Sequence, residues 1–167
     1  MSAVLDVRSA PVLSDEDRAR AEHYAVLSRL FASAPDAEFL HKLPALAAAW
    51  GSSGNALGQA WLMLRDAALS TDAEQLEDEY TRLFLTIGRP DVMLFGSFYM
   101  AGFLMEGPVV ELRADLAELG LGRRFGVTES EDHIAALCDV MRHLIVTGPD
   151  AAGLGRQQLF FTRHVAP

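Results

Sequence analysis

Apolar residues recur along this chain at the three-to-four-residue spacing of one face of an α-helix. Ser14 precedes three acidic residues and then such a stripe. Short polar side chains cap helices and acidic residues favour the positive end of the helix dipole, so a helix is expected to begin there. Proline and glycine mark the later boundaries, and no run of alternating β-branched residues predicts a strand. The pattern predicts an all-α, single-domain bundle of seven to nine helices over residues 1–167.

The same signals locate the other helix starts. Pro44 falls inside the second helix and is expected to kink or split it. Leu57 and Trp61 lie on the apolar face of the third, and Thr71 and Glu74 have the spacing of a capping box for the fourth. The remaining starts are expected near residue 97, at Gly107-Pro108, at Thr128 or Ser130, and after Gly148-Pro149.

The stretch between residues 85 and 98 is apolar, although Pro90 and Gly96 interrupt it. It is too hydrophobic for a solvated linker, so its side chains are either buried or offered to a partner. The aromatic and methionine residues at 93–105 leave the same alternatives open, a core or a groove. An apolar hinge loop is expected around residues 85–97. The predicted organisation is a flexible segment 1–13 and two sub-halves, 14–85 and 97–167, joined by a hinge at 86–96.

The composition excludes several classes of function. The formal net charge is −9, and nucleic-acid binding would need a basic face. Cys138 is the only cysteine, so neither a disulfide framework nor a thiol-rich metal site is expected. No apolar run approaches the ~20 residues needed to cross a bilayer. The N-terminus lacks the pattern of a signal peptide, and the protein is expected to be cytoplasmic.

No residue pattern supports catalysis or a metal site. The five histidines are scattered, without an HExxH sequence or a paired His/Cys spacing. Asp139 and His143 lie one helical turn apart, but two ligands do not make a site. The nucleophile elbow and the glycine-rich phosphate-binding motifs are absent, and Cys138 is expected to be a buried, unreactive thiol. The chain is not expected to be an enzyme or to hold a cofactor.

His133 ends the acidic run Glu129-Ser130-Glu131-Asp132-His133. In one interpretation Thr128 or Ser130 caps the next helix, and His133 only occupies its first turn. In the other, Asp132 and His133 hold the neighbouring apolar stretch by side-chain hydrogen bonds or bind a partner. The sequence leaves both interpretations open.

Four features, in this order and at this spacing, resemble the TorD/DmsD family of cytoplasmic maturation chaperones for molybdenum-containing redox enzymes. They are the EYTRLF segment from Glu79 to Phe84, the linker from Pro90 to Gly96-Ser97, the Gly120-Leu121 helix end and the acidic run ending at His133. The segment QQLFFTRH at 157–164 is similar to the family's following helix. The resemblance covers roughly residues 15–164, and its specific part lies between 79 and 133.

The resemblance implies a system-specific chaperone that binds the twin-arginine leader, the apo form, or both, of a molybdenum-containing oxidoreductase subunit. It would assist cofactor insertion and delay export. A leader has a basic Arg-Arg region followed by an apolar helix, so its receptor needs an acidic rim beside an apolar groove. The carboxylates expected to meet the arginines are Glu79, Asp91, Glu129 and Glu131. The implied peptide-binding residues are Tyr80, Leu83, Phe84, Gly96, Ser97, Tyr99, Glu129, Asp132 and His133.

The chain departs from the family pattern in three places. Ser130 replaces the signature proline, the hinge carries less proline, and the chain stops at Pro167, where family members continue through another helix. A missing closing helix would leave apolar surface open, so a homodimer formed by domain swapping is one expected partner.

Two alternatives are kept beside this interpretation. The first is a small-molecule-binding protein or enzyme that handles molybdenum cofactor or a nucleotide in a pocket between helices. The second is a chaperone for a membrane-anchored nitrate reductase without an exported leader, which differs only in its client. The sequence does not name the client; formate dehydrogenase, an S- or N-oxide reductase and nitrate reductase are all compatible with it.

Overall fold

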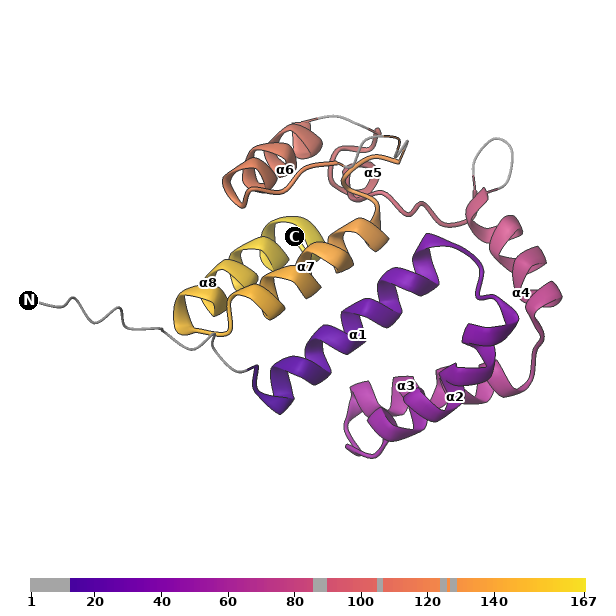
Figure 1. Cartoon of the computed structure of the whole chain (residues 1–167). Helices are drawn as coiled ribbons and strands as arrows, with labels where there is room; N and C mark the ends of the chain where they lie inside the picture. Colours follow the sequence, from indigo (N-terminus) through magenta and orange to yellow (C-terminus); the bar gives the residue numbers. More distant parts are fainter. Residues whose placement is uncertain (1–12, 86–89, 105–106, 124–125, 127–128) are drawn as a thin grey trace, which may run out of the picture. The chain divides into compact units, whose positions relative to one another are not determined.

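The computed structural model describes residues 13–85, 90–104, 107–123, 126 and 129–167 (Figure 1). These residues contain eight α-helices and no strand, so the predicted all-α class is confirmed. The helices are α1 (Asp15–Ala32), α2 (Ala37–Gly51), α3 (Ala56–Leu69), α4 (Ala73–Tyr80), α5 (Gly96–Ala101), α6 (Gly107–Glu118), α7 (Ile134–Thr147) and α8 (Ala151–Phe160). Two of them, α4 and α8, continue directly into π-helical turns, η1 (Thr81–Leu85) and η2 (Phe161–Val165).

The chain divides into two compact units. Unit 1 contains the described residues up to Ser28 and Phe95–Pro167, whereas unit 2 contains Arg29–Leu94. Most of α1 therefore belongs with the C-terminal helices. Of the expected hinge, residues 86–89 lie outside the described residues.

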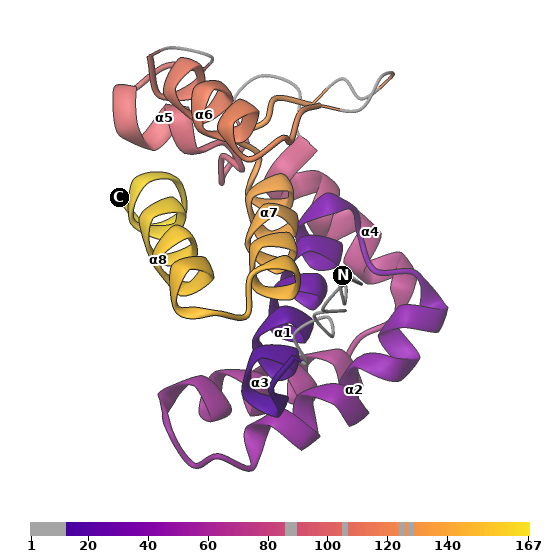
Figure 2. The same cartoon turned by 60° about the vertical axis from the view of Figure 1, so that its left-hand side comes forward.

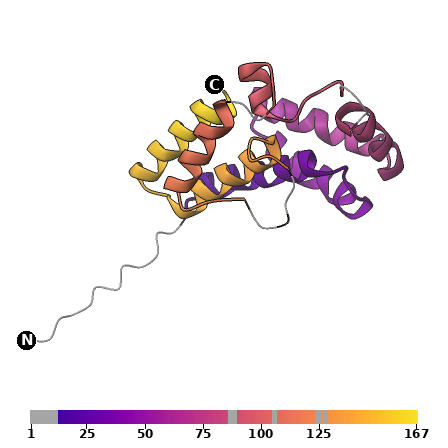
Figure 3. The same cartoon turned by 90° about the horizontal axis from the view of Figure 1, so that it is seen from above.

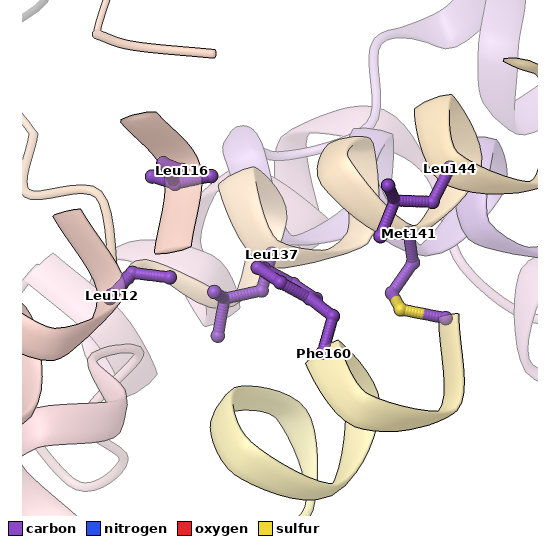
Figure 4. Packing of buried hydrophobic residues seen from close by; sticks show 6 residues of the cluster. All are labelled: Leu112, Leu116, Leu137, Met141, Leu144 and Phe160. Atoms are coloured by element: carbon purple, nitrogen blue, oxygen red, sulfur yellow. The ribbon is translucent and has the colours of Figure 1, made fainter. Parts of the chain in front are cut away.

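The core of unit 1 forms where α6, α7 and α8 meet. In Figure 2, α7 and α8 lie side by side, and Figure 3 shows the same helices with α6 from above. Tyr24 of α1 packs against the edge of this core. Figure 4 shows the central side chains of the core. They are Leu112 and Leu116 of α6, Leu137, Met141 and Leu144 of α7, and Phe160 of α8. Three of these six side chains come from α7, so the apolar face of α7 is the centre of this core.

Unit 2 is built on the packing of α2 against α3. Trp50 and Trp61 meet edge to face, with ring centroids 4.7 Å apart. The chain approaches itself closely at the turn between the helices: a Cβ atom on Gly58 would lie 2.4 Å from the Ser53 Oγ and 3.1 Å from the Gly51 carbonyl oxygen. Glycine is therefore favoured there, because any side chain would force the Ser53 hydroxyl and the preceding helix end to shift. Leu57, in contrast, is 55% exposed and does not share the buried face of Trp61.

Three local expectations need correction. α2 continues through Pro44 as one helix, so the expected split does not occur; Leu43 and Ala47 on either side of it are buried and hold the segment by packing. The start of α4 is capped by Asp72, whose carboxylate accepts a hydrogen bond from the Gln75 N–H at 2.9 Å. Thr71 therefore stands one residue before the cap.

The third correction concerns α7. The residue that caps it is His133, whereas Ser130 stands four residues before the first helical position and Thr128 lies outside the described residues. The predicted end of α6 is confirmed, since Gly120 follows it with a φ of 71°.

Candidate partner-binding site

The end of the acidic run is joined to the start of α5 by the backbone. The Gly96 N–H donates to the Asp132 carbonyl oxygen at 3.0 Å, and Phe95 and His133 form an isolated antiparallel bridge. The Phe95 ring also meets the His133 imidazole edge to face, with centroids 5.1 Å apart. These contacts bring together four of the residues singled out by the sequence: Gly96, Ser97, Asp132 and His133.

Asp132 supplies the side chain that completes this junction. Its Oδ2 accepts a hydrogen bond from the Ser97 N–H at 2.8 Å, and both residues are buried, with 4% and 1% exposure. Burial alone would raise the pKa of Asp132, but the nearby Ser130 hydroxyl and the donors of Ser97 outweigh it and lower that pKa. No hydrogen bond of regular geometry among the described residues reaches its Oδ1. Asp132 is therefore an ionised, buried carboxylate at the first turn of α5.

His133 has a defined structural role, the capping of α7. Its Nδ1 accepts a hydrogen bond from the Ala135 N–H at 3.2 Å, which places the ring proton on Nε2. Burial lowers the pKa of His133 and so favours this neutral form, although the charges of Glu129 and Asp132 oppose the shift. The helix start was expected to fall on a serine or threonine, because these are the usual caps.

Glu131 points its carboxylate at two arginines. Its Oε2 lies 2.9 Å from the Arg113 Nη2, and its Oε1 lies 3.7 Å from the Arg123 Nε. The hydrogen bond from Arg113 is the main reason that the pKa of Glu131 is lowered. Glu129, two residues earlier, is exposed.

The segment from Tyr80 to Phe84 lies in unit 2, where an internal contact anchors it. The Tyr80 hydroxyl donates to the Phe31 carbonyl oxygen at 2.7 Å, and the Phe84 ring packs edge to face on Tyr80 at 4.9 Å. The Leu83 carbonyl oxygen accepts a hydrogen bond from the Val92 N–H at 3.1 Å. The expected arginine partners Glu79 and Asp91 both form ion pairs with Arg82.

α5 and the turn after it expose apolar side chains. Gly102 has a φ of 80°, a left-handed conformation that ends the helix and turns the chain. Tyr99 and Phe103 are 66% and 70% exposed. We call the α5 surface the set Tyr99, Met100, Phe103 and Leu104. Of the alternatives for residues 93–105, Leu94 and Ser97 are therefore buried, whereas residues 99–104 face solvent.

The sequence indicated Tyr99 but did not separate Phe103 and Leu104 from core residues. A local signal was available, because Gly102 interrupts the helical period and so moves the next residues off the buried face. Among the described residues no group of three His, Cys, Asp or Glu side chains is suitably placed for a metal ion. No described helix is both long enough and apolar enough to span a bilayer.

Comparison with known proteins places this architecture in a class. A crystal structure of a candidate redox enzyme maturation protein from Archaeoglobus fulgidus has the same fold, with a TM-score of 0.57 and 18% sequence identity. The match covers 93% of this chain and 97% of that one. The search of curated proteins found no significant match. The likeness shows that the two chains share one fold.

The family follows from the sequence itself. The model of the nitrate reductase delta subunit family matches residues 52–167, which is more than half of the chain. The protein belongs to this family of TorD-like maturation chaperones, and the resemblance seen in the sequence is confirmed. Members assist the maturation of a redox enzyme and associate with one of its subunits; they are not themselves the catalyst.

Proposed function

We propose that this chain binds the unfinished catalytic subunit of a molybdenum-containing oxidoreductase through an apolar segment of that subunit. The family description favours a nitrate reductase as the first client to test. Where the client carries a twin-arginine leader, binding delays export until the cofactor is inserted. Where it carries none, the same surface holds the apo subunit during cofactor insertion.

The α5 surface is the observation that carries this proposal. A helix of six residues is too short to be stable alone, yet α5 is held at both ends. Asp132 bonds its first turn, and the left-handed Gly102 closes its last. Tyr99 on this helix and Phe103 just after it are exposed to water. Exposed, preorganised aromatic side chains are typical of recognition surfaces for apolar peptide segments.

The charge of the chain suits a client segment that also contains arginine. A net charge of −9 attracts a cationic peptide and raises its rate of association. Glu129 is the exposed carboxylate of the acidic run, whereas Glu131 is paired within the chain. Glu129 is therefore the proposed first contact for a leader arginine.

Tyr80, Leu83 and Phe84 are kept as a second proposed contact region, in unit 2. Leu83 and Phe84 are half-buried, so each still has surface for a partner. Tyr80 serves mainly to anchor η1 through its hydrogen bond to Phe31.

The small-molecule alternative receives less support from the described surface. A hollow of about 290 Å³ lies between the start of α1 and the α7–α8 connection in unit 1. Its charged lining is mostly acidic: Glu16, Asp17 and Asp150, with Arg20 as a cation that is already paired with Asp17. The net negative charge of this lining disfavours the phosphate groups of a nucleotide or of molybdenum cofactor. A phosphate-bearing ligand would need a different site.

The test is a calorimetric titration with three peptides. One is a twin-arginine leader of a molybdoenzyme, one is its Arg-Arg→Lys-Lys form, and one is the N-terminal segment of a nitrate reductase catalytic subunit without an Arg-Arg pair. The wild-type protein should bind at least one of them with a Kd near ~1 μM. Tyr99→Ser with Phe103→Ser should weaken binding about tenfold or more, because two apolar anchors are lost.

A matched control removes two other exposed apolar residues of unit 1. Leu154 and Leu159 of α8 are 55% and 57% exposed, and their double substitution by serine should leave binding unchanged. Equal losses in both double variants would contradict a site at α5. Saturable binding of molybdenum cofactor or a nucleotide, with no peptide bound, would favour the alternative.

A further inference from the structure

Glu131 lies within the acidic run that the proposed function places at the client, yet its carboxylate is already occupied. Arg113, from α6, reaches Oε2 at 2.9 Å, and Arg123, from the segment after α6, approaches Oε1 at 3.7 Å. Each oxygen thus faces one guanidinium group of the same chain. Two arginines around one carboxylate reproduce, inside the protein, the arrangement that an arginine-bearing client segment would seek.

The exposed fractions of the three side chains show which partner can leave the ion pair. The Glu131 side chain is only 11% exposed, whereas those of Arg113 and Arg123 are 45% and 40% exposed. A cationic segment that approaches from solvent therefore meets the internal guanidinium groups before it meets the carboxylate. Long, exposed arginine side chains can return to water at little cost, because their charge is solvated there. The Glu131 carboxylate, in contrast, is largely buried and lacks such access to water.

A second ion-pair cluster in unit 1 provides a contrast. Asp115 is bound by Arg163 at 2.8 Å and by His164 at 2.7 Å, and the His164 side chain is only 4% exposed. One partner of Asp115 is therefore buried and cannot be exchanged for a group from solvent. Glu131 has exposed partners on both oxygens, so of these two carboxylates it is the one at which exchange is feasible.

We propose that Arg113 and Arg123 are internal competitors that occupy Glu131 until an arginine-bearing segment of the client displaces them. The proposal rests on the proposed function and names the regulation of the same site. Displacement turns two single-oxygen contacts into one two-pronged guanidinium–carboxylate pair, which is the stronger geometry. A client without arginine gains nothing from the exchange, so the internal pair also favours clients that carry arginine.

The test compares double variants in the peptide titration. Arg113→Gln with Arg123→Gln should lower the Kd of an Arg-Arg leader peptide about three- to tenfold, because the competing ion pairs are removed. Arg113→Gln alone should account for most of the gain, since its contact is at hydrogen-bond distance and that of Arg123 is not. Adding Glu131→Gln to the double variant should abolish the gain.

Removing two positive charges also makes the protein more acidic, and this effect needs a matched control. Arg18→Gln with Arg142→Gln changes the net charge equally, at exposed positions of α1 and α7 away from this cluster. Thermal unfolding of each variant verifies that it is folded. A double variant that binds no more tightly than this control, while the wild type binds the leader, overturns the competitor role alone. If neither the wild type nor the double variant binds any leader, leader recognition fails as well.

Discussion

His133 illustrates how a residue proposed for binding also performs a structural task. Its Nδ1 caps α7 only while it carries no proton, because a protonated imidazole has no lone pair to accept the Ala135 N–H. The ring also packs against Phe95, so the same side chain connects the acidic run to the segment before α5. A partner that contacts His133 would therefore also contact a side chain that packs against the residue before α5.

The first prediction concerns pH. Burial lowers the pKa of His133, so below its ordinary value of 6.5 the unfolded chain binds more protons at this site than the folded protein. The contribution of neutral His133 to the free energy of unfolding is present above about pH 6.5. It is lost as the pH falls through the pKa of His133 in the folded protein. His133→Asn keeps a side chain that can cap α7 but does not titrate. As the pH is lowered, the free energy of unfolding of this variant should fall by about 1 kcal/mol less than that of the wild type.

Urea unfolding of both proteins between pH 7.5 and 5 measures this difference. The pKa of His23 is also lowered by burial, but His23 is present in both proteins, so its contribution cancels in the comparison. Parallel stability curves for the wild type and the variant would show that the cap does not titrate.

At the scale of elements, α5 depends on a contact that is distant in the sequence. Asp132, 35 residues away, provides the acceptor for the Ser97 N–H, one of the donors that a helix start leaves unpaired. The acidic run therefore acts on the α5 surface by holding the helix that presents it, in addition to any direct contact with a client.

Asp132→Ala should consequently affect both stability and binding. It removes the acceptor of the buried Ser97 N–H, and we expect a loss of about 1–3 kcal/mol in the free energy of unfolding. Leader or apo-subunit affinity should also fall, although Tyr99 and Phe103 are untouched. Asp139→Ala, at an exposed position of α7 with the same charge change, is the control and should alter neither quantity. Normal affinity in Asp132→Ala would mean that α5 needs no support from the acidic run.

At the scale of the whole molecule, net charge determines how a client is attracted before any specific contact forms. The formal net charge of the chain is −9, and salt screens the long-range attraction between this charge and a cationic client. Raising the ionic strength from about 0.05 M to 0.5 M should weaken binding of an Arg-Arg leader roughly tenfold, mostly through slower association. An Arg-Arg→Gln-Gln peptide should change much less; equal salt dependence of the two peptides would place the attraction elsewhere in the leader.

Several features of this protein could be predicted from the sequence because they depend on neighbours along the chain. The helix start after Ser14, the end of α6 at Gly120 and the buried stripe of α7 all follow from local periodicity and capping, and the structure confirms them. The family followed in the same way, from motifs at fixed spacing. Two predictions failed where side chains compete for one role: at Thr71, and at the cap of α7, where His133 takes the place expected for a serine or threonine. The split expected at Pro44 does not occur, because packing holds α2 together.

What the sequence determined by itself is the set of helices, the acidic charge and the family. The tertiary structure decided which polar side chains already have a hydrogen-bond or ion-pair partner within the chain. Asp132 and Glu131 are adjacent in the sequence and chemically alike, yet one is buried against Ser97 and the other faces two exposed arginines. The physical reason is that hydrogen-bond and ion-pair partners come from segments far apart in the chain, and only folding brings them within reach.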